Sequence, residues 1–249
     1  MGVFDLPAPL FAWLDDLMSG VAPPTLRLIL WGVVGAVVSM ALYWALSPQR
    51  RIARTKAEAA EARRALDAYD GEFAGAWPLI RRTLRLALKQ VGLVAWPAVA
   101  ASLPVLALLA WLSTAYGYAL PAAGTEVDVR TFPRALPARL VHGADEEEPP
   151  PSAAATPRIV VADEAGRVVG SVPLTAPVST LHKREWWNAL FGNPAGYLPD
   201  DAPLDRIEIG LPQKEYIALG PAWLRSWYVV FFAALLAGSL AIKIAARIE

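Results

Sequence analysis

Three long apolar runs divide the chain, and each is long enough to cross a bilayer as a helix. A helical span needs roughly 20 mostly apolar residues to cross about 30 Å of hydrocarbon. The runs cover 28–46, 91–112 and 226–242. With their flanks they predict transmembrane segments at 24–47, at 91–115 and within 222–249. Pro97 and Pro104 lie in the second run, so we expect a kinked helix whose freed carbonyls find other partners.

Residues 48–90 show the pattern of a helical hairpin. Residues 51–69 are rich in Ala, Arg, Glu and Lys and contain no Pro or Gly, which favours a helix continuing from the first span. Asp70 and Gly71 end it, and a second helix is expected to start near Pro78. An apolar stripe follows at steps of three and four: Leu66, Tyr69, Phe73, Trp77, Ile80 and Leu84. This hairpin is either a solvated charged linker folded on itself or a surface that contacts a ribosome, a partner or a substrate at an anionic membrane.

Residues 116–221 predict a small β-rich domain. Two apolar segments within 158–173 flank a turn and predict a hairpin, and 206–211 with 215–219 predict a second strand pair. Between them, 183–191 predicts a short helix with Trp186 and Trp187, one expected in the core and one at the membrane. The acidic, proline-rich stretch 143–157 predicts a disordered loop.

At the N-terminal end of the chain, residues 1–23 predict an interfacial segment with an amphipathic helix over 4–18.

Composition supports membrane burial, because 55% of the residues are hydrophobic and only 18% are charged. The predicted fold class is therefore an all-α membrane core of three transmembrane helices with a cytoplasmic helical hairpin. A small β-rich extracytoplasmic domain is inserted between spans two and three.

Charge predicts the orientation, although the formal net charge is zero. The residues before the first span carry only acids, Asp5, Asp15 and Asp16, whereas Lys243 and Arg247 follow the third span. The segment between spans one and two carries the basic residues Arg50, Arg51, Arg54, Lys56, Arg63, Arg64, Arg81, Arg82, Arg85 and Lys89. By the positive-inside rule this segment and the C-terminus are cytoplasmic and the N-terminus is outside.

The inventory of reactive side chains argues against an enzyme. The chain has no cysteine, and His142 and His182 do not form a metal-binding spacing. The aspartates Asp200, Asp201 and Asp205 lack the ligand order of a calcium loop and are expected to be solvated turn residues. The sequence also lacks a P-loop and a G-x-S-x-G motif. We therefore expect no catalytic residue, no cofactor and no metal.

Polar and small residues recur on the spans and leave two interpretations. Helix packing is one, because such residues let helices approach closely in lipid. The other is a hydrophilic groove in which Arg27 attracts polar or acidic parts of a translocating segment. The candidate groove residues are Arg27, Gly35, Ser39, Ser102, Ser113 and Ser239, and the candidate interfacial anchors are Trp223, Trp227 and Tyr228.

The order of these features resembles the YidC-type insertase superfamily, particularly its archaeal YidC-like members and the insertase subunit of the endoplasmic-reticulum membrane complex. The likeness covers roughly the first 118 and the last 30 residues. In the first span, Thr25-Leu26-Arg27 opens an outside-in helix, and 43–49 leads into a charged hairpin. The second span carries Trp96-Pro97, Leu103-Pro104 and Trp111-Leu112, and residues 223–228 open the last span. The superfamily core commonly lacks an outer domain of this size, and bacterial members usually have five core spans.

The resemblance implies a membrane-protein insertase or chaperone that works without ATP through a polar intramembrane groove, with Arg27 as its basic residue. The implied partners are the lipid bilayer and nascent or client membrane proteins, with a ribosome or another membrane subunit as further candidates, and no specific nucleic-acid sequence. The implied location is the prokaryotic plasma membrane. The alternative function is a non-catalytic scaffold or assembly subunit whose outer domain binds a partner protein.

Overall fold

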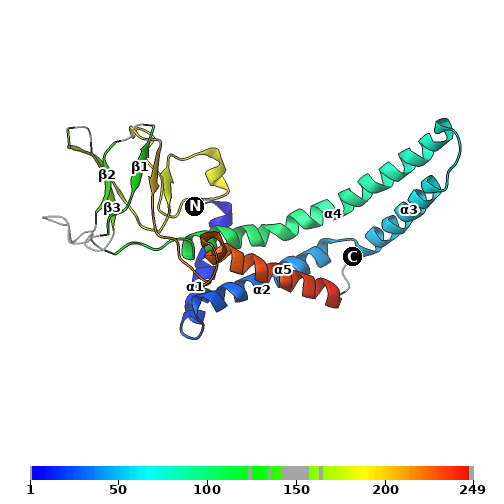
Figure 1. Ribbon diagram of the computed structural model, residues 1–249, viewed down its shortest axis with the longest axis horizontal. Helices are drawn as coiled ribbons and strands as arrows, with labels where there is room; N and C mark the ends of the chain where they lie inside the picture. The colour runs from blue at the N-terminus through cyan, green and yellow to red at the C-terminus, as the bar shows by residue number, and fades with distance from the viewer. Residues whose placement is uncertain (1, 123–124, 134–135, 142–156, 163–164, 247–249) are drawn as a thin grey trace. The chain divides into compact units, whose positions relative to one another are not determined.

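The computed structural model describes residues 2–122, 125–133, 136–141, 157–162 and 165–246 (Figure 1). It divides the chain into two compact units. The first, here called the sheet unit, comprises Met1–Leu28 and Leu106–Val230. The second, the helical unit, comprises Ile29–Val105 and Phe231–Glu249. The stretch 143–156, which holds nearly all of the predicted disordered loop, and the residues His142 and Arg247 lie outside the described residues.

Three helices are long and apolar enough to cross a membrane: α2 (Pro24–Leu46), α4 (Phe73–Ala115) and α5 (Trp227–Ala246). They contain the three predicted apolar runs almost completely, and the chain is thus compatible with an integral membrane protein. Pro24 opens α2, where its missing N–H costs no helical hydrogen bond.

The segment between α2 and α4 differs in detail from the prediction. Helix α3 (Gln49–Asp67) does not continue from the first span, because α2 ends at Leu46 and Pro48 caps a new helix. Helix α4 begins at Phe73 rather than near Pro78 and runs unbroken through Pro78, Pro97 and Pro104. A proline at position 78 is tolerated because it lies near the start of the helix, where it removes only the hydrogen bond to the Ala74 carbonyl. The turn before Pro78 is already formed, because the N–H groups of residues 75 and 76 both donate to the Glu72 carbonyl.

Helix α3 and the first part of α4 are antiparallel neighbours (Figure 1). The Lys89 ammonium lies 3.7 Å from the Glu58 carboxylate across the two helices. On α3 the buried residues are Ile52, Thr55 and Ala62. The aromatic members of the predicted apolar stripe lie outside α3 and are exposed, whereas α3 itself packs through small and aliphatic side chains.

Within the helical unit, α2 and α5 approach closely at glycines. A Cβ atom on Gly32 would lie 2.7 Å from the Ala234 Cβ and 2.8 Å from the Phe231 carbonyl oxygen. A Cβ atom on Gly238 would lie 3.0 Å from the Ala36 Cβ. Small residues at such crossings bring helix backbones together, which is the packing expected between membrane helices.

The predicted β-rich region is present as two antiparallel three-stranded sheets. One has the order β1 (Val129–Phe132), β6 (Arg206–Ile209), β5 (Thr180–His182). The other has the order β2 (Ala138–Val141), β3 (Arg158–Ala162), β4 (Val168–Pro173). The β3–β4 pair confirms the predicted hairpin over 158–173, whose turn residues 163–164 lie outside the described residues.

Two local predictions in this region are wrong. Strand β6 pairs with β1 and β5, not with 215–219. The later segment is held elsewhere, because the N–H of Lys214 donates to the Gly117 carbonyl and that of Tyr216 to the Arg225 carbonyl. The helix expected over 183–191 is reduced to one 3-10 turn, η3 (Trp186–Ala189), since hydrogen bonds to neighbouring loops keep His182 and Lys183 extended.

The core of the sheet unit lies between these strands, where Ile159, Leu174, Leu181 and Ile207 are almost fully buried.

The N-terminal segment belongs to the sheet unit. It comprises η1 (Val3–Asp5) and α1 (Ala8–Ser19), separated by a turn at Leu6 and Pro7, where a helix over 4–18 was expected. Phe4 stacks on Phe191 with ring centroids 4.8 Å apart. A further 3-10 turn, η4 (Ala222–Arg225), precedes α5.

Candidate functional sites

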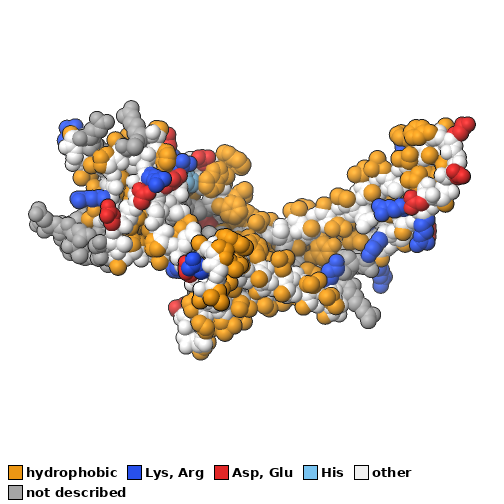
Figure 2. Space-filling view, in the orientation of Figure 1, with side chains coloured by type: hydrophobic (Ala, Val, Ile, Leu, Met, Phe, Trp, Pro, Cys, Tyr) orange, Lys and Arg blue, Asp and Glu red, His pale blue; other side chains and the backbone are white. Residues whose placement is uncertain are grey.

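Five large apolar side chains form an exposed row on the first part of α4, here called the α4 strip: Phe73, Trp77, Leu84, Leu88 and Val91. At 3.6 residues per turn they fall within about 60° of one another around the helix. Phe73 and Trp77 also touch, with ring centroids 6.2 Å apart. The space-filling view shows hydrophobic side chains along this arm of the molecule (Figure 2). Exposed apolar surface of this extent is typical of a contact with a partner or with lipid.

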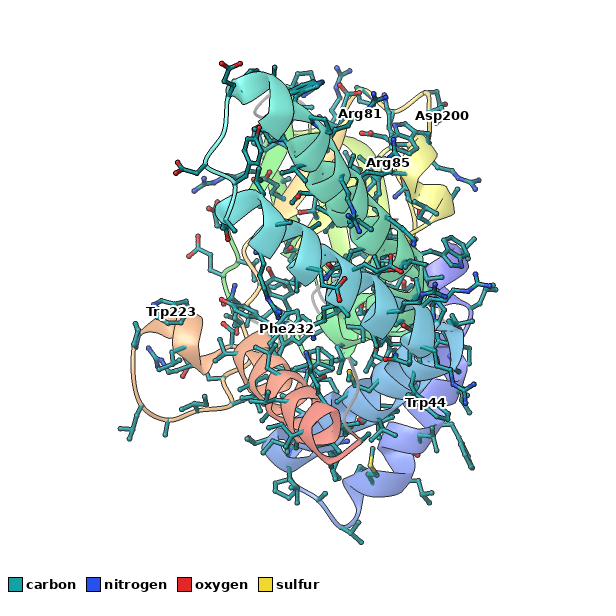
Figure 3. All side chains as sticks on the ribbon, turned by 90° about the vertical axis from the view of Figure 1, so that its right-hand side faces the viewer. Trp44, Arg81, Arg85, Asp200, Trp223 and Phe232 are labelled. Carbon is teal, nitrogen blue, oxygen red and sulfur yellow. The ribbon has the colours of Figure 1, made fainter. Side chains whose placement is uncertain are left out.

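Basic side chains flank the α4 strip on one side. Four exposed basic residues lie about 80–180° from Phe73 in rotation about the helix axis: Arg81, Arg82, Arg85 and Lys89. Figure 3 shows Arg81 and Arg85 projecting from α4. The remaining side of the helix, with Thr83 and Leu86, is half-buried. This part of α4 therefore has a packed side, an apolar exposed side and a basic exposed side.

The predicted groove residues of the helical unit are mainly engaged in helix contacts. Gly35 is buried, and the Ser39 hydroxyl donates to the Ala101 carbonyl at 2.8 Å, which joins α2 to α4 beside Ser102. The Ser102 hydroxyl donates within its own helix to the Val99 carbonyl at 2.7 Å. Ser239 on α5 is half-buried. Ser39 thus joins two facing helices, as the packing interpretation expects, whereas Ser102 is exposed and bonds only within its own helix.

Arg27 and Ser113 belong to the sheet unit. The Ser113 hydroxyl donates to the Ala110 carbonyl of its own helix. Arg27 is paired: its Nη1 lies 2.7 Å from an Asp15 carboxylate oxygen, and both side chains are at least four-fifths buried. The guanidinium carbon also lies 5.8 Å from the centre of the Tyr116 ring. The charge of Arg27 is therefore paired with a carboxylate of this chain's own α1, although its buried Nε has no hydrogen-bond partner among the described residues.

Asp15 and Arg27 belong to a larger polar group, here called the Arg27 cluster, with Tyr116, Lys214 and Tyr216. The Tyr116 hydroxyl donates to Asp15, and the Tyr216 hydroxyl donates to the Tyr116 carbonyl at 2.8 Å. Lys214 Nζ donates to the Ala115 carbonyl at 2.9 Å. The cluster borders a cavity of about 460 Å³, also lined by Pro24, Thr25, Ala115 and Glu215.

Burial dominates the electrostatics of this cluster. It raises the pKa of Tyr216 to about 12 and raises the pKa of Tyr116, which the hydrogen bond to Asp15 raises further. Burial lowers the pKa of the Lys214 ammonium, and the positive charge of Arg27 lowers it further. Sequence reasoning singled out Arg27 alone, since its partners come from three separate segments.

The predicted anchors fall at the start of α5. Trp223 is exposed in η4, and Figure 3 shows it at the edge of the molecule. Tyr228 is exposed and Trp227 half-buried, with their rings in edge contact at 6.1 Å. Trp186 is 83% exposed and Trp187 is 37% exposed, so neither is a core residue.

Among the described residues, no group of three or more His, Cys, Asp and Glu side chains could hold a metal ion. Comparison with protein-family models, curated proteins and solved structures gives no match for this chain.

Proposed function

We propose that this protein is a YidC-like membrane-protein insertase or chaperone, and that the α4 strip receives the apolar segment of its client. In this proposal the basic hairpin is cytoplasmic, the N-terminus and the sheet unit are outside, and the membrane is a prokaryotic plasma membrane. The carrying observation is the exposure of the strip on a helix that continues without a break into an apolar span.

The length of the strip suits a transmembrane client. Phe73 and Val91 are 18 residues apart, so the strip extends roughly 27 Å at 1.5 Å per residue. That is close to the thickness of the hydrocarbon core, about 30 Å. Each large apolar side chain that a client covers would contribute about 1.5–3 kcal/mol through burial. A client helix could therefore be held along its apolar length before it enters the membrane.

The basic residues beside the strip would orient it toward the membrane surface. Arg81, Arg82, Arg85 and Lys89 would keep the hairpin on the side of the anionic leaflet, where each basic residue near the surface contributes about 1 kcal/mol. Arg27 has no client-binding role in this proposal, because Asp15 already accepts two hydrogen bonds from it. No nucleotide is required, since burial of the client's apolar surface drives its transfer.

Site-specific photocrosslinking tests the proposal. A photoreactive amino acid replaces Trp77, Leu84 or Leu88, and ribosome-bound chains carrying one apolar segment are added to membranes containing the full-length protein. Crosslinks are expected at these positions, whereas the matched exposed positions Arg82 and Arg85 should give few. Leu84→Glu should also lower client insertion into proteoliposomes several-fold, because it places a charge on the strip, while Ala60→Glu, which places the same charge at an exposed position of α3, should not.

The alternative, a scaffold whose sheet unit binds a partner protein, is favoured by one observation. Trp186, with the partly exposed Trp187 and Leu190, presents an apolar patch on η3. If the α4 strip gives no client crosslinks and depletion leaves membrane-protein insertion unchanged, the scaffold function replaces the insertase function.

A further inference from the structure

The Arg27 cluster lies at the level of the lipid headgroups if the three apolar helices cross the bilayer. Arg27 is the fourth residue of α2, and Tyr116 directly follows the last residue of α4. A helix that spans about 30 Å of hydrocarbon has its ends roughly 15 Å from the midplane, where the headgroup region begins. Phosphate groups are the main anions at that depth.

The cluster carries one positive charge without an anionic partner. Arg27 is paired with Asp15, and Glu215 lies 2.8 Å from Arg225. In the part of the chain that the structure describes, no carboxylate lies within ion-pair distance of Lys214, whose Nζ donates to the Ala115 carbonyl. A partly buried ammonium without a counter-charge is unfavourable, and an anion beside it would relieve that cost.

Space for such an anion adjoins Lys214. The cavity of about 460 Å³ is lined by Lys214, Arg27, both cluster tyrosines and two acidic residues, Asp15 and Glu215, each of which is paired with an arginine. This volume is many times that of one water molecule, about 30 Å³ in the liquid. It can therefore take a phosphodiester together with part of its glycerol.

The neighbouring helix α1 favours a lipid over a soluble ligand. While Asp15 and Phe11 hold α1 to the rest of the sheet unit, Leu10, Trp13 and Leu17 are exposed together on another side of the helix. Only residues 20–23 separate α1 from the apolar helix α2. An amphipathic helix tied this closely to a span lies in the interface, with its apolar side among acyl chains. The chain has no basic residue before Arg27, so this contact does not depend on attraction to lipid charge.

We propose that the cavity of the Arg27 cluster binds the phosphate of a phospholipid in the leaflet next to the sheet unit. Lys214 supplies the ion pair, Arg27 supplies a second positive charge, and Tyr216 borders the phosphate. Exposed apolar residues of α1 contact the acyl chains of the same leaflet. The site requires that the helices span the membrane, but it does not depend on client insertion.

Lipid binding by the purified full-length protein tests this site. The protein is transferred from phosphatidylcholine nanodiscs containing 10% phosphatidylglycerol into mild detergent, and retained phospholipid is counted by native mass spectrometry. Lys214→Gln should lower the affinity for retained lipid about tenfold, as expected for the loss of a charge-assisted contact. Lys214→Arg should retain it. The matched control Lys183→Gln removes another lysine of the sheet unit, which is paired with Asp205, and should have no effect.

A second measurement needs no variant. The labelling rate of Lys214 by an amine-specific reagent should fall when phosphatidylglycerol is added, and inorganic phosphate at the same concentration should protect much less. Equal lipid retention by Lys214→Gln and wild type, with no protection by lipid, would overturn the proposal. Protection by inorganic phosphate alone would indicate a site for a soluble anion, and protection by an acidic client peptide but not by lipid would indicate a client site. Either result contradicts lipid binding.

Discussion

The two units of the chain treat apolar surface and charge in opposite ways. The sheet unit buries Ile159, Leu174 and Leu181 almost completely and closes a network around Arg27. The helical unit leaves large apolar side chains exposed along α2, α4 and α5 and buries few of them. The sheet unit can therefore be stabilised by its own packing in water, whereas the exposed apolar side chains of the helical unit are compatible with burial in lipid.

A matched pair of leucines tests this difference most strongly. Leu174 is fully buried in the sheet unit, whereas Leu236 on α5 is 68% exposed. Leu174→Ala should lower the free energy of unfolding of the sheet unit by about 2–5 kcal/mol, because it removes apolar contacts and leaves a cavity. Leu236→Ala should change this free energy of unfolding by less than about 0.5 kcal/mol. Both can be measured on the full chain in nanodiscs by denaturant-dependent proteolysis, and equal losses would contradict the comparison.

Elements that depend on nearby residues could be predicted from the sequence. A run of about 20 apolar residues favours a helix long enough to span a membrane, so the three runs lie almost entirely inside observed helices, although α4 begins 18 residues before its run. The β3–β4 hairpin also followed from local pattern, because its strands are joined by a short turn. Helix breaks were less predictable. Pro48 separates α2 from α3, while Pro78, Pro97 and Pro104 are accommodated inside α4.

The remaining features depend on contacts between distant residues. Strand β6 pairs with β1, which lies more than 70 residues earlier, so a nearby candidate at 215–219 was preferred wrongly. Lys214 and Ala115 are 99 residues apart, and only the folded chain brings them together. Periodicity located the stripe of Phe73, Trp77 and Leu84 but could not show that this side of α4 stays exposed.

Substitution of two helix glycines should show a second, smaller difference in stability, because only one of them lies at a close helix contact. Gly32 touches α5, whereas nothing lies within 4 Å of a Cβ atom placed on Gly92 of α4. Gly32→Ala should destabilise the α2–α5 contact by about 1–3 kcal/mol, because the added methyl group meets the Phe231 backbone and forces the helices apart. Gly92→Ala should be neutral or slightly stabilising, since alanine favours a helix. Crosslinking between engineered cysteines on α2 and α5 reports the contact. Undiminished crosslinking in Gly32→Ala would show that the helices are not held at this point.

Ion pairs should show the smallest measurable difference between the units. Asp15 and Arg27 are largely shielded from water, whereas the Arg54 side chain of the Arg54–Glu58 pair on α3 is 84% exposed. Double-mutant cycles with Asp15→Asn and Arg27→Gln should give a coupling energy of about 1–2 kcal/mol, because shielded, hydrogen-bonded charges interact more strongly than hydrated ones. The cycle with Arg54→Gln and Glu58→Gln should give about 0.3–0.5 kcal/mol, and salt should reduce it further. Both cycles can be followed by unfolding in nanodiscs at low and high ionic strength. If the Asp15–Arg27 coupling were as small and as sensitive to salt as the α3 pair, the Arg27 cluster would be open to water, and Arg27 would again be available to a client.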